Sequence, residues 1–242
     1  MAADPAKRTE PMTAATILPR EDVARITARA LIEVQAVHLR PSDPFTYTSG
    51  LKSPVYVDCR KLIGYPRLRA TLMQMGVGTM AREVGLERFD AVAGGETAGI
   101  PFAAWMADLM GLPMQYIRKK PKGFGRGAQI EGAFKEGQRT LLVEDLATDG
   151  GSKVRFAEAL REAGAEIAHC FVVFHHDIFP DSSNAMTRHG IALHTLARWS
   201  DVLKVARAEG ALDAADLTEV EAFLDAPLAW SAKHGGIDRI DV

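Results

Sequence analysis

The sequence predicts an α/β protein with a central, mainly parallel sheet flanked by helices. The first observation is a regular alternation of short apolar runs and amphipathic segments between Asp90 and Phe174, which is typical of consecutive strand–helix–strand units. The second is composition: of 242 residues, 47% are hydrophobic and 25% charged, as in globular domains. A chain of this length buries a core without crosslinks, so we expect one folded domain over residues 21–242.

The N-terminal part predicts a tail, a helix and a hairpin. Residues 1–20 contain several charges and three prolines, and we expect them to form a flexible tail. They contain no apolar stretch as long as that of a secretory signal, so we do not expect one. From Glu21 to about Val37, apolar residues recur at helical spacing. Phe45–Arg60 is expected to form two short strands around a Ser-Gly turn. This hairpin lies outside the main sheet and completes a small hood over about residues 21–65.

Apolar periodicity and punctuating Gly and Pro residues predict the remaining elements. Pro66 begins a helix that ends near Gly85, and Gly111 and Gly164 end two later helices. A possible capping box at Thr218 and Glu221 marks the last helix. The expected order is a strand at 90–93, a helix at 100–110, strands at 113–117 and 140–143, a helix at 152–163, a strand at 167–174, and C-terminal helices within about 200–230, one of them at 202–208.

Charge and cysteine content exclude several classes of function. The chain has 29 Lys and Arg against 31 Asp and Glu, a net charge of −2, so no overall basic field is present to hold a nucleic acid. Cys59 and Cys170 lack metal or redox spacing, which predicts buried structural thiols in a reducing compartment. No apolar window is long enough to cross a membrane. We expect a cytoplasmic protein with neither nucleic-acid nor membrane partners.

The segment LLVEDLATDGGS at 141–152 carries the strongest chemical signal. It is an apolar strand that ends in Glu144 and Asp145, followed by a glycine turn and a helix. In an open parallel sheet, ligands bind at the carboxyl ends of the strands. Gly150 and Gly151 expose backbone N–H groups, and Ser152 opens a helix whose N-terminus favours an anion. Because carboxylates accept hydrogen bonds from hydroxyls, the segment suits a ribose 5-phosphate group.

A simpler interpretation of this segment is also open. The acids could merely end a strand and cap a helix. The segment also lacks the P-loop pattern and the G-x-G-x-x-G fingerprint, which removes two common nucleotide-binding interpretations.

The segment resembles the phosphoribosyl pyrophosphate (PRPP) motif of the type I phosphoribosyltransferases. Three further segments resemble one family among them, orotate phosphoribosyltransferase: FTYTSGLKSPVYVDCR at 45–60, GGETAGIPFAAW at 94–105 and RKKPKGFGRGAQIEG at 118–132. The resemblance implies a type I phosphoribosyltransferase-like fold. It also implies the reaction of orotate with PRPP to give orotidine 5′-monophosphate and pyrophosphate, in pyrimidine (UMP) biosynthesis.

The resemblance further implies Mg²⁺ carried mainly by the pyrophosphate and a homodimer in which loop 118–132 of one subunit closes over the active site of the other. An oxocarbenium-like transition state with an anionic leaving group needs cations over the pyrophosphate and acceptors around the ribose. Without the resemblance, the basic run in this loop would be interpreted as a solvated surface turn.

Matching the motifs residue by residue assigns roles. The expected catalytic residues are Lys122, as the cation over the pyrophosphate, and Glu144 and Asp145, which contact the ribose hydroxyls. Thr148 matches a position that contacts orotate, and Lys52 lies in the segment expected near the orotate carboxylate. The full expected PRPP set is Arg118, Lys119, Lys122, Glu144, Asp145, Thr148, Asp149, Gly150, Gly151 and Ser152, with the turn 94–99 against the pyrophosphate and no residue acting as a metal ligand.

Three positions depart from the family pattern. Phe124 stands where many relatives have His, Asp149 where they have Thr, and Ala98 where some have Lys. An acid at a phosphate site repels the ligand unless its side chain turns away. These departures leave open a PRPP-binding regulator or inactive paralogue, and a phosphoribosyltransferase for another base is a further alternative.

Basic groups that could meet the orotate carboxylate are Lys52, Arg60 and His176, without a ranking. His175 and His176 are adjacent on a predicted strand and therefore point to opposite faces, so we expect no metal there and one of them in the base pocket.

Overall fold

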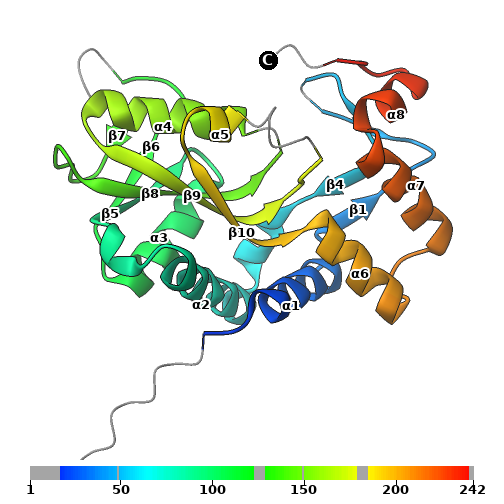
Figure 1. Ribbon diagram of the computed structural model, residues 1–242, viewed down its shortest axis with the longest axis horizontal. Coiled ribbons are helices and arrows are strands. Elements are labelled where there is room, and N and C mark those ends of the chain that lie inside the picture. The colour runs from blue at the N-terminus through cyan, green and yellow to red at the C-terminus, as the bar shows by residue number, and fades with distance from the viewer. Residues whose placement is uncertain (1–16, 48, 123–128, 149, 179–184, 240–242) are drawn as a thin grey trace, which may run out of the picture.

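The computed structural model describes residues 17–47, 49–122, 129–148, 150–178 and 185–239 (Figure 1). Its centre is a six-stranded sheet in the order β10-β9-β8-β5-β6-β7. The first five strands in this order pair in parallel, and β7 pairs antiparallel with β6. The strands are β5 (Ala91–Gly95), β6 (Met114–Ile117), β7 (Ile130–Glu131), β8 (Arg139–Ala147), β9 (Glu166–His175) and β10 (Ala192–Arg198).

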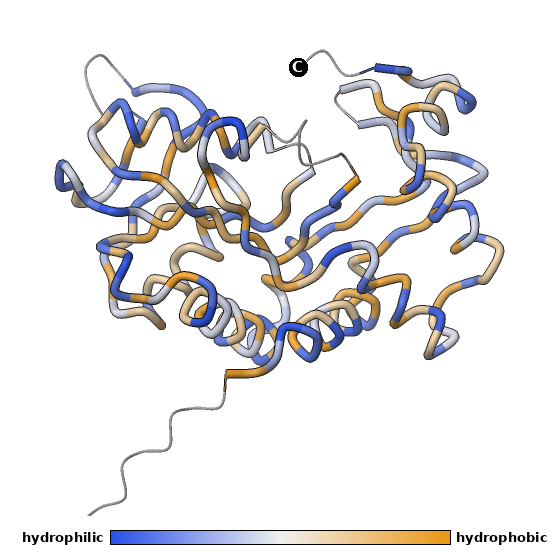
Figure 2. The backbone as a smooth tube through the Cα atoms, in the orientation of Figure 1, coloured by the Kyte–Doolittle hydropathy of each residue, from blue (hydrophilic) through white to orange (hydrophobic). Residues whose placement is uncertain are grey.

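Helices cover both faces of the sheet, as Figure 1 shows. On one face lie α1 (Arg20–Glu33), α2 (Pro66–Glu83) and α3 (Gly99–Met110), and on the other α4 (Gly151–Ala163) and the short α5 (Ala185–Arg188). Successive residues of β8 alternate between two buried clusters: Leu141 and Val143 join the larger one, and Leu142 joins the one under α4. This alternation is what a strand buried on both faces requires. The central strands are accordingly rich in hydrophobic residues (Figure 2).

Gly76 determines how closely α2 approaches the sheet. A Cβ atom there would lie 2.7 Å from the ring of Phe171 in β9. Any larger residue at this position would overlap the Phe171 ring. The glycine therefore allows α2 to pack directly on β9.

The hood and the C-terminal helices form the other end of the molecule. The hood contains two antiparallel pairs, β1 (Val37–Leu39) with β4 (Val55–Val57) and β2 (Phe45–Thr46) with β3 (Lys52–Ser53), and the 3₁₀ helix η1 (Cys59–Gly64). Its hairpin meets the last helix, because the backbone N–H of Lys52 donates to Ser231 Oγ at 3.0 Å. The remaining elements are η2 (Leu86–Arg88), α6 (Trp199–Glu209), α7 (Ala214–Asp225) and α8 (Pro227–Lys233).

Most predicted elements are confirmed, with two corrections to their bounds and one to a helix cap. The first helix ends at Glu33 rather than near Val37, because Gln35 takes a positive φ of 55° and Val37 begins β1. Strand β8 continues to Ala147. The predicted capping box at Thr218 is wrong, because Asp213 caps α7 by accepting from the N–H groups of Ala215 and Asp216.

The sequence analysis missed β1, β7, β10, α5 and α8, most of which are very short. Of the predicted tail, residues 1–16 lie outside the described part, whereas Leu18 packs against the larger core cluster. The division into a tail and one domain stays a prediction. Within the described residues, no helix is long and apolar enough to span a membrane.

Candidate active site

A cavity of about 690 Å³ opens at the carboxyl ends of β5 and β8, where an open parallel sheet binds ligands. Its walls come from the hood, the turn after β5, the segment after β6, strand β8 and the start of α4. The lining residues are Arg60, Glu96, Thr97, Ala98, Lys119, Gln129, Glu144, Ser152, Arg155, Phe156, Glu158, Ala159 and Glu162.

Glu144 is the buried acid of this cavity, with 6% of its surface exposed. Its Oε2 lies 3.6 Å from Lys153 Nζ, and its Oε1 has no hydrogen-bond partner. Burial raises the pKa of Glu144 to about 7, against the opposing effect of the Lys153 ammonium. A buried carboxylate oxygen without a partner costs free energy, and at the wall of a cavity it is an acceptor available to a ligand hydroxyl.

Two glycines make room for this carboxylate. A Cβ atom on Gly95, the last residue of β5, or on Gly99, the first of α3, would collide with Glu144 Oε1. At Gly99 it would also lie 2.7 Å from the carbonyl oxygen of Val143. Glycine is therefore needed at both positions to leave space for the Glu144 side chain.

Asp145 projects from the opposite face of β8, as adjacent strand residues do. Its Oδ1 accepts from the backbone N–H of Leu146 at 2.9 Å, and 8% of the residue is exposed. Burial raises its pKa, while the Lys153 ammonium and, more weakly, the Arg60 guanidinium oppose that rise. The sequence analysis placed both acids after the strand. They lie inside it, because β8 remains paired to Ala147, and this explains their burial.

Lys153 was missed by the sequence analysis. It lies in the first turn of α4, is 7% exposed, and also donates to Ser152 Oγ at 3.3 Å. A lysine near a helix N-terminus is unfavourable, and this local conflict is the signal that could have identified it.

The predicted phosphate turn is described in part. Gly150 has a left-handed φ of 81° and is the N-cap of α4, and its carbonyl accepts from the N–H groups of Lys153 and Val154 at 3.0 Å. Gly151 begins the helix and Ser152 lines the cavity. Thr148 is half-buried, and Asp149 lies outside the described residues.

The basic segment begins beside the cavity and its two ends are tied together. Arg118 donates its N–H to the carbonyl of Gln129 at 2.8 Å, and the Gln129 side chain returns a bond to the Arg118 carbonyl. The backbone N–H of Lys119 donates to Glu96 Oε2 at 2.7 Å. Lys122 is exposed at the last described position before residues 123–128, which include Phe124 and lie outside the description.

Sequence comparison identifies the family. Over 212 residues the chain is 60% identical to the orotate phosphoribosyltransferase of Cereibacter sphaeroides (strain KD131 / KCTC 12085), which is 88% of this chain and 91% of that protein. The chain belongs to the orotate phosphoribosyltransferase family. Its residues 69–186 also match the phosphoribosyl transferase domain.

Solved structures agree with this family. The orotate phosphoribosyltransferase of Aeropyrum pernix superposes with a TM-score of 0.64 at 30% identity, covering 76% of this chain and 99% of that one. Leishmania donovani UMP synthase gives a TM-score of 0.71 at 28% identity over 83% of this chain. The match covers 42% of that longer protein. The α/β fold predicted from the sequence is thereby confirmed as that of a type I phosphoribosyltransferase.

Three basic residues are candidates for the orotate carboxylate in this member of the orotate phosphoribosyltransferase family. Of the three, only Arg60 lines the described cavity. Its Nε donates to Asp58 Oδ1 at 2.7 Å and its terminal nitrogen to the Tyr56 hydroxyl at 2.8 Å, so the guanidinium is held in place. Lys52 does not line this cavity. It lies on β3, where its backbone contacts Ser231 of α8.

His176 is buried rather than available as a cation. Its Nδ1 accepts from Trp199 Nε1 at 3.1 Å, and burial lowers its pKa to about 3. The candidacy of His176 as a cationic partner is therefore wrong at neutral pH. Across the described residues, no group of three or more His, Cys, Asp and Glu could hold a metal ion. Cys59 and Cys170 are buried free thiols.

Proposed function

We propose that the protein transfers the ribose 5-phosphate group of PRPP to orotate, giving orotidine 5′-monophosphate and pyrophosphate in pyrimidine biosynthesis. The observation that supports this most is the carboxylate oxygen of Glu144 that has no partner in the cavity wall. The N-terminus of α4, at Gly151, follows it a few residues later in the sequence. A hydroxyl acceptor beside an anion-favouring helix end suits ribose 5-phosphate.

The candidate site residues divide the substrate among them. Glu144 and Asp145 accept hydrogen bonds from the ribose hydroxyls, and the turn from Thr148 through Asp149 and Gly150 to Gly151 and Ser152 surrounds the 5′-phosphate. Fixed acceptors stabilise the positive charge that develops on the ribose as the bond to pyrophosphate breaks.

Cations over the leaving group complete the reaction. Arg118 and Lys119 contact PRPP, and Lys122 compensates the charge that gathers on the departing pyrophosphate. The support is positional: Lys119 lines the cavity and the clamp between Arg118 and Gln129 starts the segment at its rim. Thr148 and Lys52 are proposed for orotate. Lys52 would have to reach orotate from outside the described lining, which makes Arg60 a competing partner for the carboxylate.

Mg²⁺ is proposed to enter as the complex of PRPP, carried by its pyrophosphate, so it belongs to the substrate. We also propose a homodimer in which loop 118–132 of one subunit acts at the site of the other, and a cytoplasmic location. The exposed side chain of Lys122, directed by no described contact toward its own cavity, is compatible with either subunit as its target.

The test is the fall in orotate absorbance when the purified protein is mixed with orotate, PRPP and Mg²⁺. Uracil, hypoxanthine and adenine serve as parallel substrates. We expect loss of orotate alone. Consumption of another base would replace orotate with that base.

Silence with every base would be followed by calorimetric titration with PRPP. Binding without turnover would support a PRPP-binding regulator or an inactive paralogue. Sedimentation of the protein with and without PRPP tests the homodimer, and omission of Mg²⁺ tests the metal requirement.

A further inference from the structure

Lys153 occupies a position that is unfavourable for a lysine in two ways. It is 7% exposed, and it lies in the first turn of α4, where the positive end of the helix dipole repels a cation. Burying an ammonium costs several kcal/mol unless it is paired. The position therefore needs compensating groups around the ammonium.

The titratable groups that sense the charge of Lys153 come from several elements. Strand β8 contributes Glu144, at 3.6 Å, and Asp145. Strand β9 contributes Cys170, the residue that follows β9 is His176, and η1 contributes Cys59. The thiols and the imidazole are held neutral, since burial raises the pKa of Cys59 and Cys170 and lowers that of His176. The negative charge available to Lys153 is therefore that of the two carboxylates.

The contact also orients Glu144. Lys153 approaches Oε2, whereas Oε1 faces Gly95 and Gly99 and has no partner. Charged side chains near this end of the cavity are Arg60 from the hood, Glu96 and Lys119 from the turns after β5 and β6, and Arg155, Glu158 and Glu162 from α4. None of these side chains has an ion pair with Glu144 in the described structure, whereas Lys153 has one.

We propose that Lys153 is a positioning residue for the phosphoribosyl transfer. Its ammonium holds Glu144 by one oxygen with the other free for the ribose, and favours the charged form of both Glu144 and Asp145. This inference rests on the proposed function, because it assigns both carboxylates to the ribose hydroxyls. Lys153 itself touches neither substrate.

The proposal separates activity from stability. Without Lys153, the charged form of Glu144 loses an opposite charge, so its pKa rises further above the value of about 7 that burial already gives. Glu144 then takes up a proton instead of remaining as an unpaired buried charge. Removing one partner of a buried ion pair is strongly destabilising where the other charge remains, and protonation of Glu144 relieves that cost. A purely structural lysine therefore predicts lost stability with an unchanged pH profile of activity, whereas a positioning lysine predicts a shifted profile.

The test compares kcat/KM for PRPP across pH in the wild type, Lys153→Met and Lys153→Arg. Lys204→Gln is the matched control, since it removes one exposed lysine charge on α6. In Lys153→Met we expect the acidic limb to move up by about one pH unit or more, because a neighbouring opposite charge lowers a carboxyl pKa by about 1–3 units. At pH 7 the ionised fraction of Glu144 then falls from about one half to about one tenth or less, which lowers kcat/KM by about fivefold or more. We expect this loss in KM for PRPP more than in KM for orotate.

Lys153→Arg should restore the acidic limb toward that of the wild type, and Lys204→Gln should leave it unchanged. A Lys153→Met enzyme that is folded and has the wild-type pH profile would overturn the proposal. So would a uniform loss at all pH values that Lys153→Arg does not relieve.

A second readout does not depend on activity. The side-chain carboxyl of Glu144 is followed by ¹³C NMR titration, with its resonance assigned by its absence in Glu144→Gln. We expect the pKa of this carboxyl to be higher in Lys153→Met than in the wild type, and an unchanged titration contradicts the proposal. If the wild type does not consume orotate, the proposed function fails on its own, while this titration still decides whether Lys153 controls Glu144.

Discussion

The two ends of the parallel strands treat charged groups in opposite ways. At the amino ends, Asp90 and Arg139 are exposed and form a forked pair, with Asp90 accepting from Arg139 Nε at 2.9 Å and from its terminal nitrogen at 2.8 Å. Arg139 holds the pKa of Asp90 well below its usual range. At the carboxyl ends, Glu144 is buried, its pair with Lys153 is longer at 3.6 Å, and one of its oxygens has no partner.

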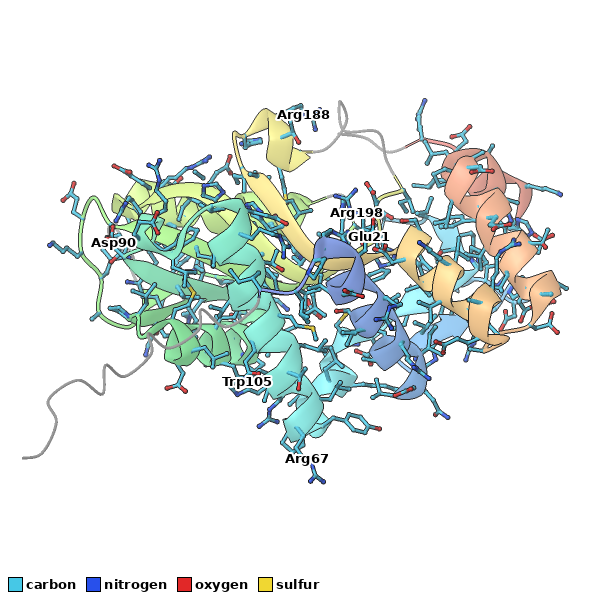
Figure 3. All side chains as sticks on the ribbon, turned by 60° about the horizontal axis from the view of Figure 1, so that its bottom comes forward. Glu21, Arg67, Asp90, Trp105, Arg188 and Arg198 are labelled. Atoms are coloured by element: carbon cyan, nitrogen blue, oxygen red, sulfur yellow. The ribbon has the colours of Figure 1, made fainter. Side chains whose placement is uncertain are left out.

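The difference separates binding from folding. Asp90 satisfies its charge within the protein, and Figure 3 shows it far from Arg198, which is the last residue of β10 and pairs with Asp177. Glu144 and Asp145 are incompletely compensated, and burial raises the pKa of both. Groups with perturbed pKa values concentrate at functional sites. A ligand at the carboxyl edge of the sheet can supply the hydrogen bonds that these two carboxylates lack.

The largest expected effect comes from the leaving-group cation. Lys122→Ala should lower kcat by about two orders of magnitude, because it removes a charge that acts in the transition state. Steady-state assay of orotate consumption measures this. The control is Lys135→Ala, which removes an exposed lysine near the amino edge. Near-normal turnover of Lys122→Ala would remove Lys122 from the mechanism.

Filling the space beside Glu144 should affect both stability and binding. In Gly95→Ala the new Cβ collides with Glu144 Oε1 and with the ring of Phe156. We expect a loss of about 1–3 kcal/mol in unfolding free energy and weaker PRPP binding, measured by urea denaturation and calorimetry.

Gly64→Ala is the matched control for this variant, because a Cβ atom there meets nothing within 4 Å. Equal effects of the two substitutions would show that Glu144 does not need the space at Gly95.

A pH experiment isolates the buried imidazole. Burial lowers the pKa of His176 from 6.5 to about 3, so the unfolded chain binds more protons between these values and stability falls as the pH drops through this window. From about pH 7 to about pH 5 this group alone costs about 2 kcal/mol.

His176→Gln keeps an acceptor for Trp199 and should lose that much less stability over the same pH step, as measured by denaturant titration at both pH values. An unchanged difference between the two pH values would show that His176 is not neutral in the folded protein.

The smallest effect is expected at the amino edge. Asp90→Asn removes a fully exposed ion pair, and such pairs contribute little. Activity should match the wild type, and the melting temperature should fall slightly, more at low salt than at high salt. A large loss of activity in this variant would contradict the contrast between the two edges.

The sequence predicted the position of the site better than its environment. The order strand, two acids, glycines, helix placed Glu144 and Asp145 at the correct edge of the sheet. It did not show that β8 continues past them, because acids usually end a strand, and the burial of both follows from that pairing. Lys153 was overlooked for a related reason: its partners are two acids on another element, brought to it only by the fold.

Short elements set another limit. Strand β7 has two residues, Ile130 and Glu131, and exists because β6 offers it a partner. Local propensity carries almost no information over such a length. The role of Lys52 likewise depends on where β3 docks against α8, which is a contact between segments almost 180 residues apart.

The two cysteines provide a way to watch the molecule come apart. Both thiols are fully buried, Cys59 in the larger core cluster and Cys170 in the cluster under α4, on opposite sides of the sheet. Neither should react with a thiol reagent until its own cluster opens. The labelling rates of single-cysteine variants would therefore report whether the two layers open together or one before the other.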